Sequence, residues 1–302
     1  MKKPLLILLA LLSFGLLEGK DSPCIAKKIR GWTYGQAKLD TAFYVEFIND
    51  HNRHILSFIQ WKAAKTRGPK LQARLVIPGA YGNFQDPLPR FLDMNINGID
   101  LQDVYIEPEK IRVWNDKKTG RSGADIPINF DGTIMNLKWY MRPDSGVLFL
   151  TLEVDKNSIT PFAKGRVDVY SCPSGLHLTR KGSVWNMNKY KRMAVTPART
   201  CTQATRKVKL QKEDTYLILM DATLPGKGDE KWVRRDHGPG VFIPDVEKTK
   251  ETLLTFGIYT NIKMTLGAEF RNMTLGFWQK KEVVTNEKVL KLVKENPAAF
   301  RK

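Results

Sequence analysis

The sequence has few of the residues on which metalloenzymes and redox enzymes depend. It holds three cysteines and four histidines in 302 residues, and it contains no CxxC, HExxH, GxSxG or EF-hand pattern. His51 and His54 stand three apart around an Asn-Arg turn, which is neither a helical ligand pair nor a zinc spacing. The composition therefore favours a protein without a metal site or a cofactor.

Long apolar runs are also missing beyond the N-terminus. There, Lys2 and Lys3 precede an apolar run from Pro4 to Leu17, the plan of a bacterial secretory signal peptide and too short for a membrane span. Cleavage could follow Gly15 or Gly19, and we take residues 1–19 as the signal; Pro23 before Cys24 argues against a lipid anchor. We expect export to the periplasm or the cell exterior, without a transmembrane span.

An oxidising compartment gives the three cysteines a structural meaning, because they favour one disulfide and one odd thiol. We predict a disulfide between Cys172 and Cys201, since the residues between them form an irregular stretch that needs fixing. Closing a loop of that size stabilises by about 3 to 4 kcal/mol in the chain-entropy model. Cys24 would then be the free thiol, and the other two pairings stay open.

Acidic residues are absent from Val169 to Lys212, although ten Lys and Arg lie there. The whole chain has 49 Lys and Arg against 31 Asp and Glu, a net charge of +18. Trp185 and Tyr190 stand among these cations, so the run is either a polyanion-binding surface or a solvated basic loop. Export disfavours DNA or RNA as the partner, and an acidic glycan or another anionic envelope polymer fits better. A second basic stretch, RVWNDKKTGRSGAD with Trp114, is expected to be a long hairpin turn.

Helical periodicity is weak along most of the chain, whereas period-two alternation recurs throughout. Val45 and Phe47 share one face of AFYVEFI, and in HILSFIQW we assign Ile55, Ile59 and Trp61 to the inward face. The dipeptides Asn97-Gly98 and Asp131-Gly132 predict hairpin turns with positive φ. The pattern predicts an all-β fold, an antiparallel two-sheet sandwich of the jelly-roll kind.

Only TNEKVLKLVKEN, close to the C-terminus, has the period of a helix, and we expect a short helix there. For domain organisation we expect one large β-sandwich over residues 20–302, with an irregular basic insertion near 172–205. The alternative is two β domains that divide near 165–205. The sequence gives no oligomeric state.

The closing segment, Phe256 to Gln279, alternates on both sides of a turn at Leu266-Gly267. Even positions from Leu254 to Met264 are predicted to face the core. We interpret the segment as a hairpin whose outward face could bind a ligand, through Tyr259, Asn261, Lys263 and Trp278.

Candidates for catalysis are few. Glu153 and Asp155 stand two apart in LEVD, so both point to one side of a strand, as a glycosidic acid and base or nucleophile must. Asp155 also suits a turn at the strand end. His237, in the loop VRRDHGPG, is a further candidate base or anion ligand.

The segments LLTFGIYTN and AEFRNMTLGF resemble the last two strands of concanavalin A-like jelly rolls, a group that includes polysaccharide lyases. The resemblance covers residues 253–277. It implies a jelly-roll sandwich in which Tyr259 would be the catalytic acid and base, with Asn261 where a Gln is expected.

Three hypotheses for function follow. The first is a secreted, non-catalytic protein that binds a glycan or anionic envelope polymer through the closing segment and a basic stretch comprising Trp185, Lys189, Tyr190, Lys191 and Arg192. The second is a polysaccharide lyase or glycosidase that uses Tyr259 or the Glu153 and Asp155 pair. The third is a structural or assembly protein of the cell envelope.

Overall fold

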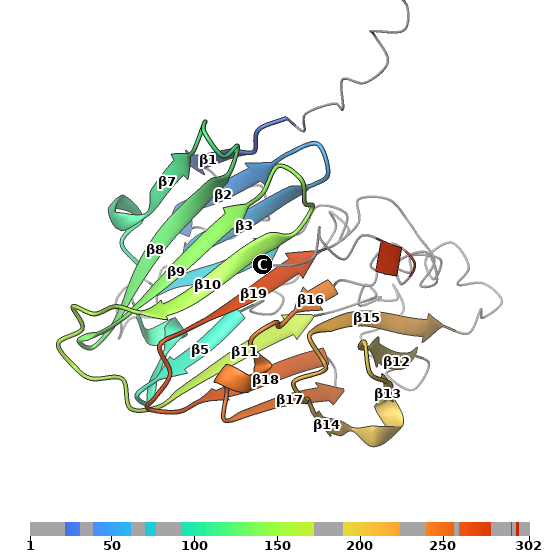
Figure 1. The fold of residues 1–302 in the computed structure, drawn as a ribbon. Coiled ribbons are helices and arrows are strands. Elements are labelled where there is room, and N and C mark those ends of the chain that lie inside the picture. Colours follow the sequence, from blue (N-terminus) through green and yellow to red (C-terminus); the bar gives the residue numbers. More distant parts are fainter. Residues whose placement is uncertain are drawn as a thin grey trace, which may run out of the picture.

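The computed structural model describes residues 22–30, 39–61, 70–76, 92–104, 106–171, 190–223, 240–256, 260–278, 291 and 294–295. Within them the chain forms antiparallel strands joined by turns and a few short 3-10 helices (Figure 1). The all-β prediction is confirmed.

The largest sheet has nine strands in the order β13-β12-β15-β16-β19-β10-β9-β8-β7. It crosses the front of the molecule in Figure 1. Its strands are β7 (Arg112–Asn115), β8 (Ser122–Phe130), β9 (Thr133–Met141), β10 (Leu148–Val154), β12 (Tyr190–Val195), β13 (Thr200–Thr202), β15 (Tyr216–Thr223), β16 (Gly240–Phe242) and β19 (Asn272–Trp278).

Two smaller sheets form the second layer. The six-stranded sheet has the order β14-β17-β18-β11-β5-β6, and the four-stranded sheet has the order β1-β2-β3-β4. Their strands are β1 (Ile25–Arg30), β2 (Leu39–Ile48), β3 (Arg53–Trp61), β4 (Lys70–Val76), β5 (Leu92–Ile96), β6 (Ile99–Asp100), β11 (Gly165–Ser171), β14 (Lys207–Lys209), β17 (Glu251–Phe256) and β18 (Thr260–Leu266). Strands from before and after residues 172–205 thus pair within the same sheets, as β11 does with β18 and β10 with β19.

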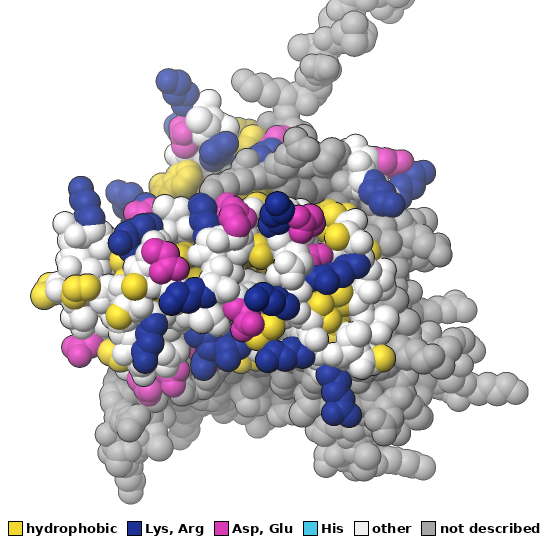
Figure 2. All heavy atoms as spheres, turned by 60° about the horizontal axis from the view of Figure 1, so that its bottom comes forward, with side chains coloured by type: hydrophobic (Ala, Val, Ile, Leu, Met, Phe, Trp, Pro, Cys, Tyr) yellow, Lys and Arg dark blue, Asp and Glu magenta, His cyan; other side chains and the backbone are white. Residues whose placement is uncertain are grey.

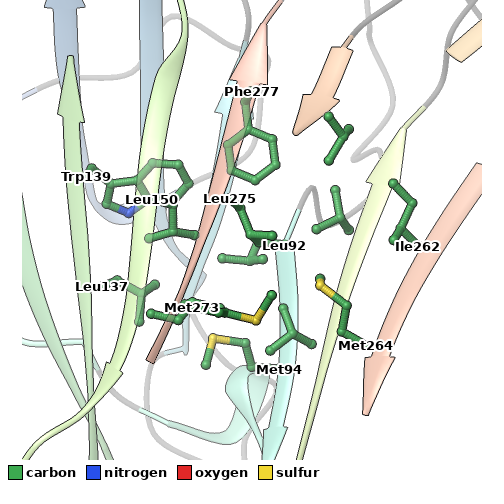
Figure 3. Close-up of a cluster of buried hydrophobic side chains, with 14 of the residues drawn as sticks. Leu92, Met94, Leu137, Trp139, Leu150, Ile262, Met264, Met273, Leu275 and Phe277 are labelled. Atoms are coloured by element: carbon green, nitrogen blue, oxygen red, sulfur yellow. The ribbon is translucent and has the colours of Figure 1, made fainter. Parts of the chain in front are cut away.

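The core lies between the layers, where one cluster of buried apolar side chains draws on all three sheets. Figure 3 shows its centre: Trp139 and Phe277 from the nine-stranded sheet lie across from Met94 and Met264 of the six-stranded sheet. All four are at most 1% exposed. Complete burial of such a side chain stabilises the fold by about 1.5 to 3 kcal/mol. The inward-facing residues of the alternating strands therefore hold the two layers together.

The closing segment is not one hairpin, which corrects the prediction. Strand β18 belongs to the six-stranded sheet and β19 to the nine-stranded sheet, so residues 267–271 carry the chain from one layer to the other. The apolar positions of the two strands, including Met264 and Met273, therefore meet across the core rather than side by side (Figure 3). A hairpin and a crossing between layers give the same alternation, because in both cases each strand turns one face inward.

The strand predicted to run through Tyr259 is also divided. Strands β17 and β18 pair with each other, with Phe256 opposite Thr260. The chain therefore reverses direction across residues 257–259, which lie outside the described residues. The predicted core positions Leu254, Phe256, Ile262 and Met264 are buried, as expected.

Both predicted hairpin turns are confirmed. Asn97 and Gly98 have φ of 53° and 92°, and Asp131 and Gly132 have φ of 49° and 89°. Two successive residues with positive φ match the twist of the flanking strands. The turns join β5 to β6 and β8 to β9 with no register shift.

In β3 the described inward-facing side chains are those of His54 and Leu56. His54 and Leu56 lie opposite Phe47 and Val45 in register, and all four are at most 1% exposed. His54 and Leu56 of β3 therefore face the core, whereas the side chains of Ile55, Ile59 and Trp61, which we assigned to the inward face, lie outside the described residues. Apolar residues occupy both parities of this strand, so alternation alone could not choose a face.

The predicted disulfide is absent, since Cys201 is a free and buried cysteine. Cys201 lies in β13 of the nine-stranded sheet, whereas Cys172 follows β11 of the six-stranded sheet and is itself outside the described residues. Cys24, the expected free thiol, is free and 3% exposed, and burial raises its pKa to about 11.

Two other predictions fall on the chain ends. Residues 1–19, the predicted signal, are outside the described residues. Within the segment of the predicted C-terminal helix, the described residues are Lys291, Lys294 and Glu295, and their backbone is helical. Lys291 Nζ lies 3.6 Å from Glu295 Oε1. The C-terminal helix itself stays a prediction.

Candidate functional site

The residues predicted to form one ligand platform lie on different sheets. Asn261 and Lys263 are on the outer face of the six-stranded sheet, where Asn261 Nδ2 donates to Asp168 Oδ1 at 3.1 Å. Trp278 ends β19 in the nine-stranded sheet and is only 5% exposed. Its Nε1 lies beside Gly146. The prediction that Trp278 is an exposed partner of Asn261 and Lys263 is therefore wrong.

Several predicted site residues lie outside the described part of the chain: Tyr259, Trp185, Lys189 and His237. Tyr190, Lys191 and Arg192 contribute backbone to β12, which pairs with β15 beside the edge strand β13. Nothing is described of their side chains, and their roles stay predictions.

The carboxyl groups of Glu153 and Asp155 are each bound by a neighbouring side chain. Lys138 Nζ lies 2.7 Å from Glu153 Oε2, while Asn136 Nδ2 donates to Asp155 Oδ2 at 2.7 Å. Asp155 Oδ1 also accepts the Asn157 amide, and this bond, followed by that from Asn136, holds the pKa of Asp155 below its ordinary value. Such a carboxyl gives up its proton readily and is a poor general acid.

One cation of the acid-free run, residues 169–212, forms an ion pair with an acid that lies just after the run in the sequence. Arg199 Nη2 lies 2.6 Å from Asp214 Oδ2, and Asp214 is 0% exposed. Burial alone would raise the pKa of Asp214, but hydrogen bonds from Thr196, the Gln211 amide and Arg199 outweigh it and hold that pKa below its ordinary value. One of the ten cations is thus part of the protein's own packing.

A row of aromatic residues crosses the outer face of the nine-stranded sheet, perpendicular to the strands. Strand register places its members at one level, separated at two strands by glycine. In order across the sheet these are Trp114, Gly123, Tyr140, Phe149, Gly276, Phe242 and Tyr216. We call the five aromatic residues the aromatic row.

Trp114 and Gly123 form one end of the aromatic row. A methyl group at Gly123 would overlap Cζ2 and Cε2 of Trp114, so the six-membered part of the indole lies against the glycine backbone. Trp114 Nε1 donates to Asp125 Oδ1 at 3.3 Å, which fixes the ring close to its contact with Gly123. The indole is half-buried, so one side lies on the sheet and the remainder is accessible.

Tyr140 continues the row by stacking on Phe149. The ring centroids are 5.1 Å apart and the planes differ by 16°. Phe149 is 2% exposed, whereas Tyr140 is half-buried, and burial raises the pKa of the Tyr140 hydroxyl. The guanidinium of Arg142 lies 6.0 Å from the Phe149 centroid. Phe242 is 3% exposed, so at this end the accessible part of the row is Trp114 and Tyr140.

Charged side chains border this accessible part on the same face. Arg112 Nη2 lies 2.7 Å from Asp125 Oδ2, and the Lys138 to Glu153 pair follows on the neighbouring strands. These side chains are partly exposed. The face therefore offers a flat π surface beside hydrogen-bond donors and acceptors, which is the chemistry that recognises the weakly positive C–H face and the hydroxyls of a sugar ring.

The sequence pattern placed Trp114 in a long hairpin turn and did not reveal its place in the aromatic row. The turn exists, since β7 and β8 pair around residues 116–121. Trp114 lies in β7, and its glycine partner becomes visible only with the register between the strands. A Trp and a Gly at equal distances from a turn are the signal that could have found it.

The described part of the chain holds no group of three or more His, Cys, Asp and Glu placed to bind a metal. None of its helices is long and apolar enough for a membrane span.

Comparison with known proteins identifies no family. No protein-family model and no curated protein matches the chain. Solved structures with a similar arrangement include a TPR-domain containing protein from Parabacteroides distasonis, with 9% identity, a TM-score of 0.45, and coverage of 87% of this chain and 56% of that one. A GH36 α-galactosidase from Geobacillus stearothermophilus has 9% identity and a TM-score of 0.39, covering 83% and 41%. The galactosidase domain of an α-galactosidase-sucrose kinase has 8% and 0.40, covering 80% and 41%.

The chain thus spans between 41% and 56% of the length of these structures. At such identities and TM-scores the likeness says nothing about what this chain binds.

Proposed function

We propose that this protein is a non-catalytic carbohydrate-binding β-sandwich, exported to the periplasm or the cell exterior, and that it binds a glycan on the outer face of β7 to β10. The observation that carries the proposal is the accessible end of the aromatic row, where Trp114 lies flat over Gly123 and Tyr140 stacks on Phe149. A sugar ring would pack on these two residues, and Asp125 and Lys138 would bond its hydroxyls.

Rigidity supports this assignment. Trp114 is held by Gly123 and Asp125, and Tyr140 by Phe149, so neither ring has to be ordered when a ligand binds. Immobilising a side chain on binding costs about 0.5 to 1.5 kcal/mol, which a preorganised ring avoids.

Catalysis is the second hypothesis, and one observation bears on it. Glu153 and Asp155 are both engaged, with Lys138 and with Asn136 and the Asn157 amide. An inverting or retaining glycosidase needs one carboxyl that stays protonated to donate to the leaving oxygen. The lowered pKa of Asp155 opposes that role for this carboxyl. A lyase that uses Tyr259 remains the alternative.

Binding to a panel of neutral and acidic polysaccharides tests the proposal. Trp114→Ala and Tyr140→Ala should each weaken the affinity for the best ligand about tenfold, the equivalent of about 1.4 kcal/mol. The control is Ile159→Ala, which removes an exposed apolar side chain from the connection after β10, away from the aromatic row.

Three results would contradict the proposal. The first is binding to no glycan at all; the second is an equal loss in all three variants at unchanged thermal stability. The third is release of reducing ends or unsaturated products from a bound polymer, which would establish an enzyme in place of a binding protein.

A further inference from the structure

A second set of side chains lies on the opposite outer face of the sandwich. Strand β14, at the edge of the six-stranded sheet, pairs with β17, which pairs with β18. Lys207 and Lys209 on β14 share the outer face with Lys263 on β18, because Lys209 and Lys263 both lie level with Leu253 of β17. We call Lys207, Lys209 and Lys263 the basic strip.

Standard sheet spacings give the size of this strip. Residues two apart on a strand are separated by about 7 Å, and strands two apart by about 10 Å. The Cα atoms of the three lysines thus lie at the corners of a triangle whose sides are about 7 to 12 Å. Lys207 and Lys209 are exposed and Lys263 is half-buried. Figure 2, which brings the lower side of Figure 1 forward, shows basic side chains spread across the described surface on this side, with acidic ones among them.

No member of the basic strip has an ion pair within the described part of the chain. The acid level with Lys263 on the next strand is Asp168, and this carboxylate is already bound by Arg166 at 2.6 Å and by Asn261 at 3.1 Å. Asp168 is 3% exposed, so it is buried under these partners. Glu251 on β17 and Asp93 on β5, which lies level with Asp168, are further acids of this face, and among the described residues neither makes an ion pair with the strip.

Charges of one sign at this spacing repel each other, and a bound anion relieves that cost. Lys207 and Lys209 belong to the acid-free run, which supplies no local counter-charge. The fold then brings Lys263, more than fifty positions later, to the same face.

Neighbouring residues favour a polysaccharide over a lipid surface. Thr255 lies level with Lys207, is partly exposed, and supplies a hydroxyl group that suits sugar hydroxyls. The large apolar residues that are exposed in the described part are Ile25 and Ile159, in β1 and in the connection after β10. A membrane-binding face uses apolar residues that enter the headgroup region, and the strip has none beside it.

We propose that the basic strip is a binding site for an acidic polysaccharide, separate from the sugar site on the nine-stranded sheet. Because the two faces belong to opposite layers, both can be occupied at once. One protein molecule could then hold an anionic polymer on one side and a second glycan on the other.

The test compares two triple variants that lower the net charge equally. Lys207→Gln/Lys209→Gln/Lys263→Gln removes the strip, and Lys27→Gln/Lys156→Gln/Lys294→Gln removes three exposed lysines elsewhere. Affinity for polygalacturonate is measured at low and at physiological salt, with thermal unfolding to check that each variant folds. We expect the strip variant to bind polygalacturonate at least fivefold more weakly than the unaltered protein, and the affinity of the control variant to change less than twofold. Added salt should weaken the binding of polygalacturonate by the unaltered protein.

An equal loss in both triple variants would overturn the proposal, because net charge alone would then explain binding. So would absence of polygalacturonate binding, or binding only to vesicles of phosphatidylglycerol and phosphatidylcholine. The sugar site is tested separately: Trp114→Ala should leave polygalacturonate binding through the strip unchanged. If Trp114→Ala loses binding to the glycan panel but the unaltered protein and the strip variant show no difference with polygalacturonate, only the sugar site is supported. If the strip variant loses polygalacturonate binding but Trp114→Ala keeps binding to the panel, only the basic strip is supported.

Discussion

The indole of Trp114 lies where a side chain of residue 123 would otherwise project, so that Gly123 and Trp114 share one position on the outer face of the nine-stranded sheet. Gly123 also lies close to the Trp139 carbonyl. The pair fixes both the plane of the ring and the accessible end of the aromatic row.

Replacing this glycine should therefore remove the platform. We expect Gly123→Ala to displace Trp114, weaken glycan binding about as strongly as Trp114→Ala, and lower the stability by about 1 to 3 kcal/mol, the usual cost of overpacking. Gly146→Ala is the control, because its methyl group would meet neighbours at 3.5 Å, an ordinary contact. Calorimetric titration with thermal unfolding measures both effects; unchanged binding in Gly123→Ala would refute the role given to the ring.

The buried pair of Arg199 and Asp214 should contribute strongly to stability. Asp214→Asn leaves Arg199 and the Thr196 hydroxyl without their charged acceptor, and we expect a loss of about 3 kcal/mol in the free energy of unfolding. The exposed pair of Lys110 and Glu107, 2.7 Å apart, gives a matched control, since Glu107→Gln should cost less than about 1 kcal/mol. Urea unfolding at pH 7 compares them.

The pH dependence of the same group has a definite sign. The folded-state pKa of Asp214 is lowered, so its stabilisation is present above the ordinary carboxyl pKa of 3.8 and is lost as the pH falls through the folded value. Asp214→Asn should therefore lose its disadvantage at low pH. Equal stability of the two proteins at pH 7 would contradict the assignment.

His54 should make stability depend on pH in a higher range. Its side chain is 0% exposed, Nε2 donates to the Gly146 carbonyl at 2.8 Å, and burial lowers its pKa from 6.5 to about 4. Between these values the unfolded chain binds a proton that the folded chain does not. The free energy of unfolding should thus fall by up to about 3 kcal/mol as the pH is lowered from 6.5 to about 4, at about 1.4 kcal/mol per pKa unit.

Variants of the two neighbouring histidines test this dependence. His54→Gln should remove that part of the pH dependence, while replacement of the exposed His51 by Gln should retain it. Urea unfolding across this pH range provides the measurement. A slope that persists in His54→Gln would mean that another group titrates there.

Asn97 connects a turn to two other segments. Its backbone has φ of 53°, its Nδ2 donates to Thr133 Oγ1 and the Pro161 carbonyl, and its Oδ1 accepts the amides of Ala163 and Lys164. We expect Asn97→Ala to cost about 2 to 4 kcal/mol, from lost hydrogen bonds and from backbone strain. Asn97→Gly keeps the positive φ without strain and should recover about 1 kcal/mol of this loss. If Gly were no better than Ala in thermal unfolding, strain would have no part.

The sequence by itself determined the strands, their turns and much of the core. Asn97-Gly98 and Asp131-Gly132 specify their turns because few residues adopt positive φ, and the even positions from Leu254 to Met264 alternate without ambiguity. Where both parities are apolar, as in β3, alternation alone could not choose the inward face, and the register with β2 was needed to place His54 and Leu56 in the core.

Only the tertiary structure decided which surfaces exist. Alternation in β18 and β19 shows that each strand buries one face, but not whether the two pair or oppose, so Asn261 and Trp278 seemed neighbours although they lie in different sheets. The pairing of Trp114 with Gly123, of Arg199 with Asp214, and of Lys263 with the level of Lys209 depends on strand register and layer crossing. These arise from contacts between residues distant in the chain, which local patterns do not encode.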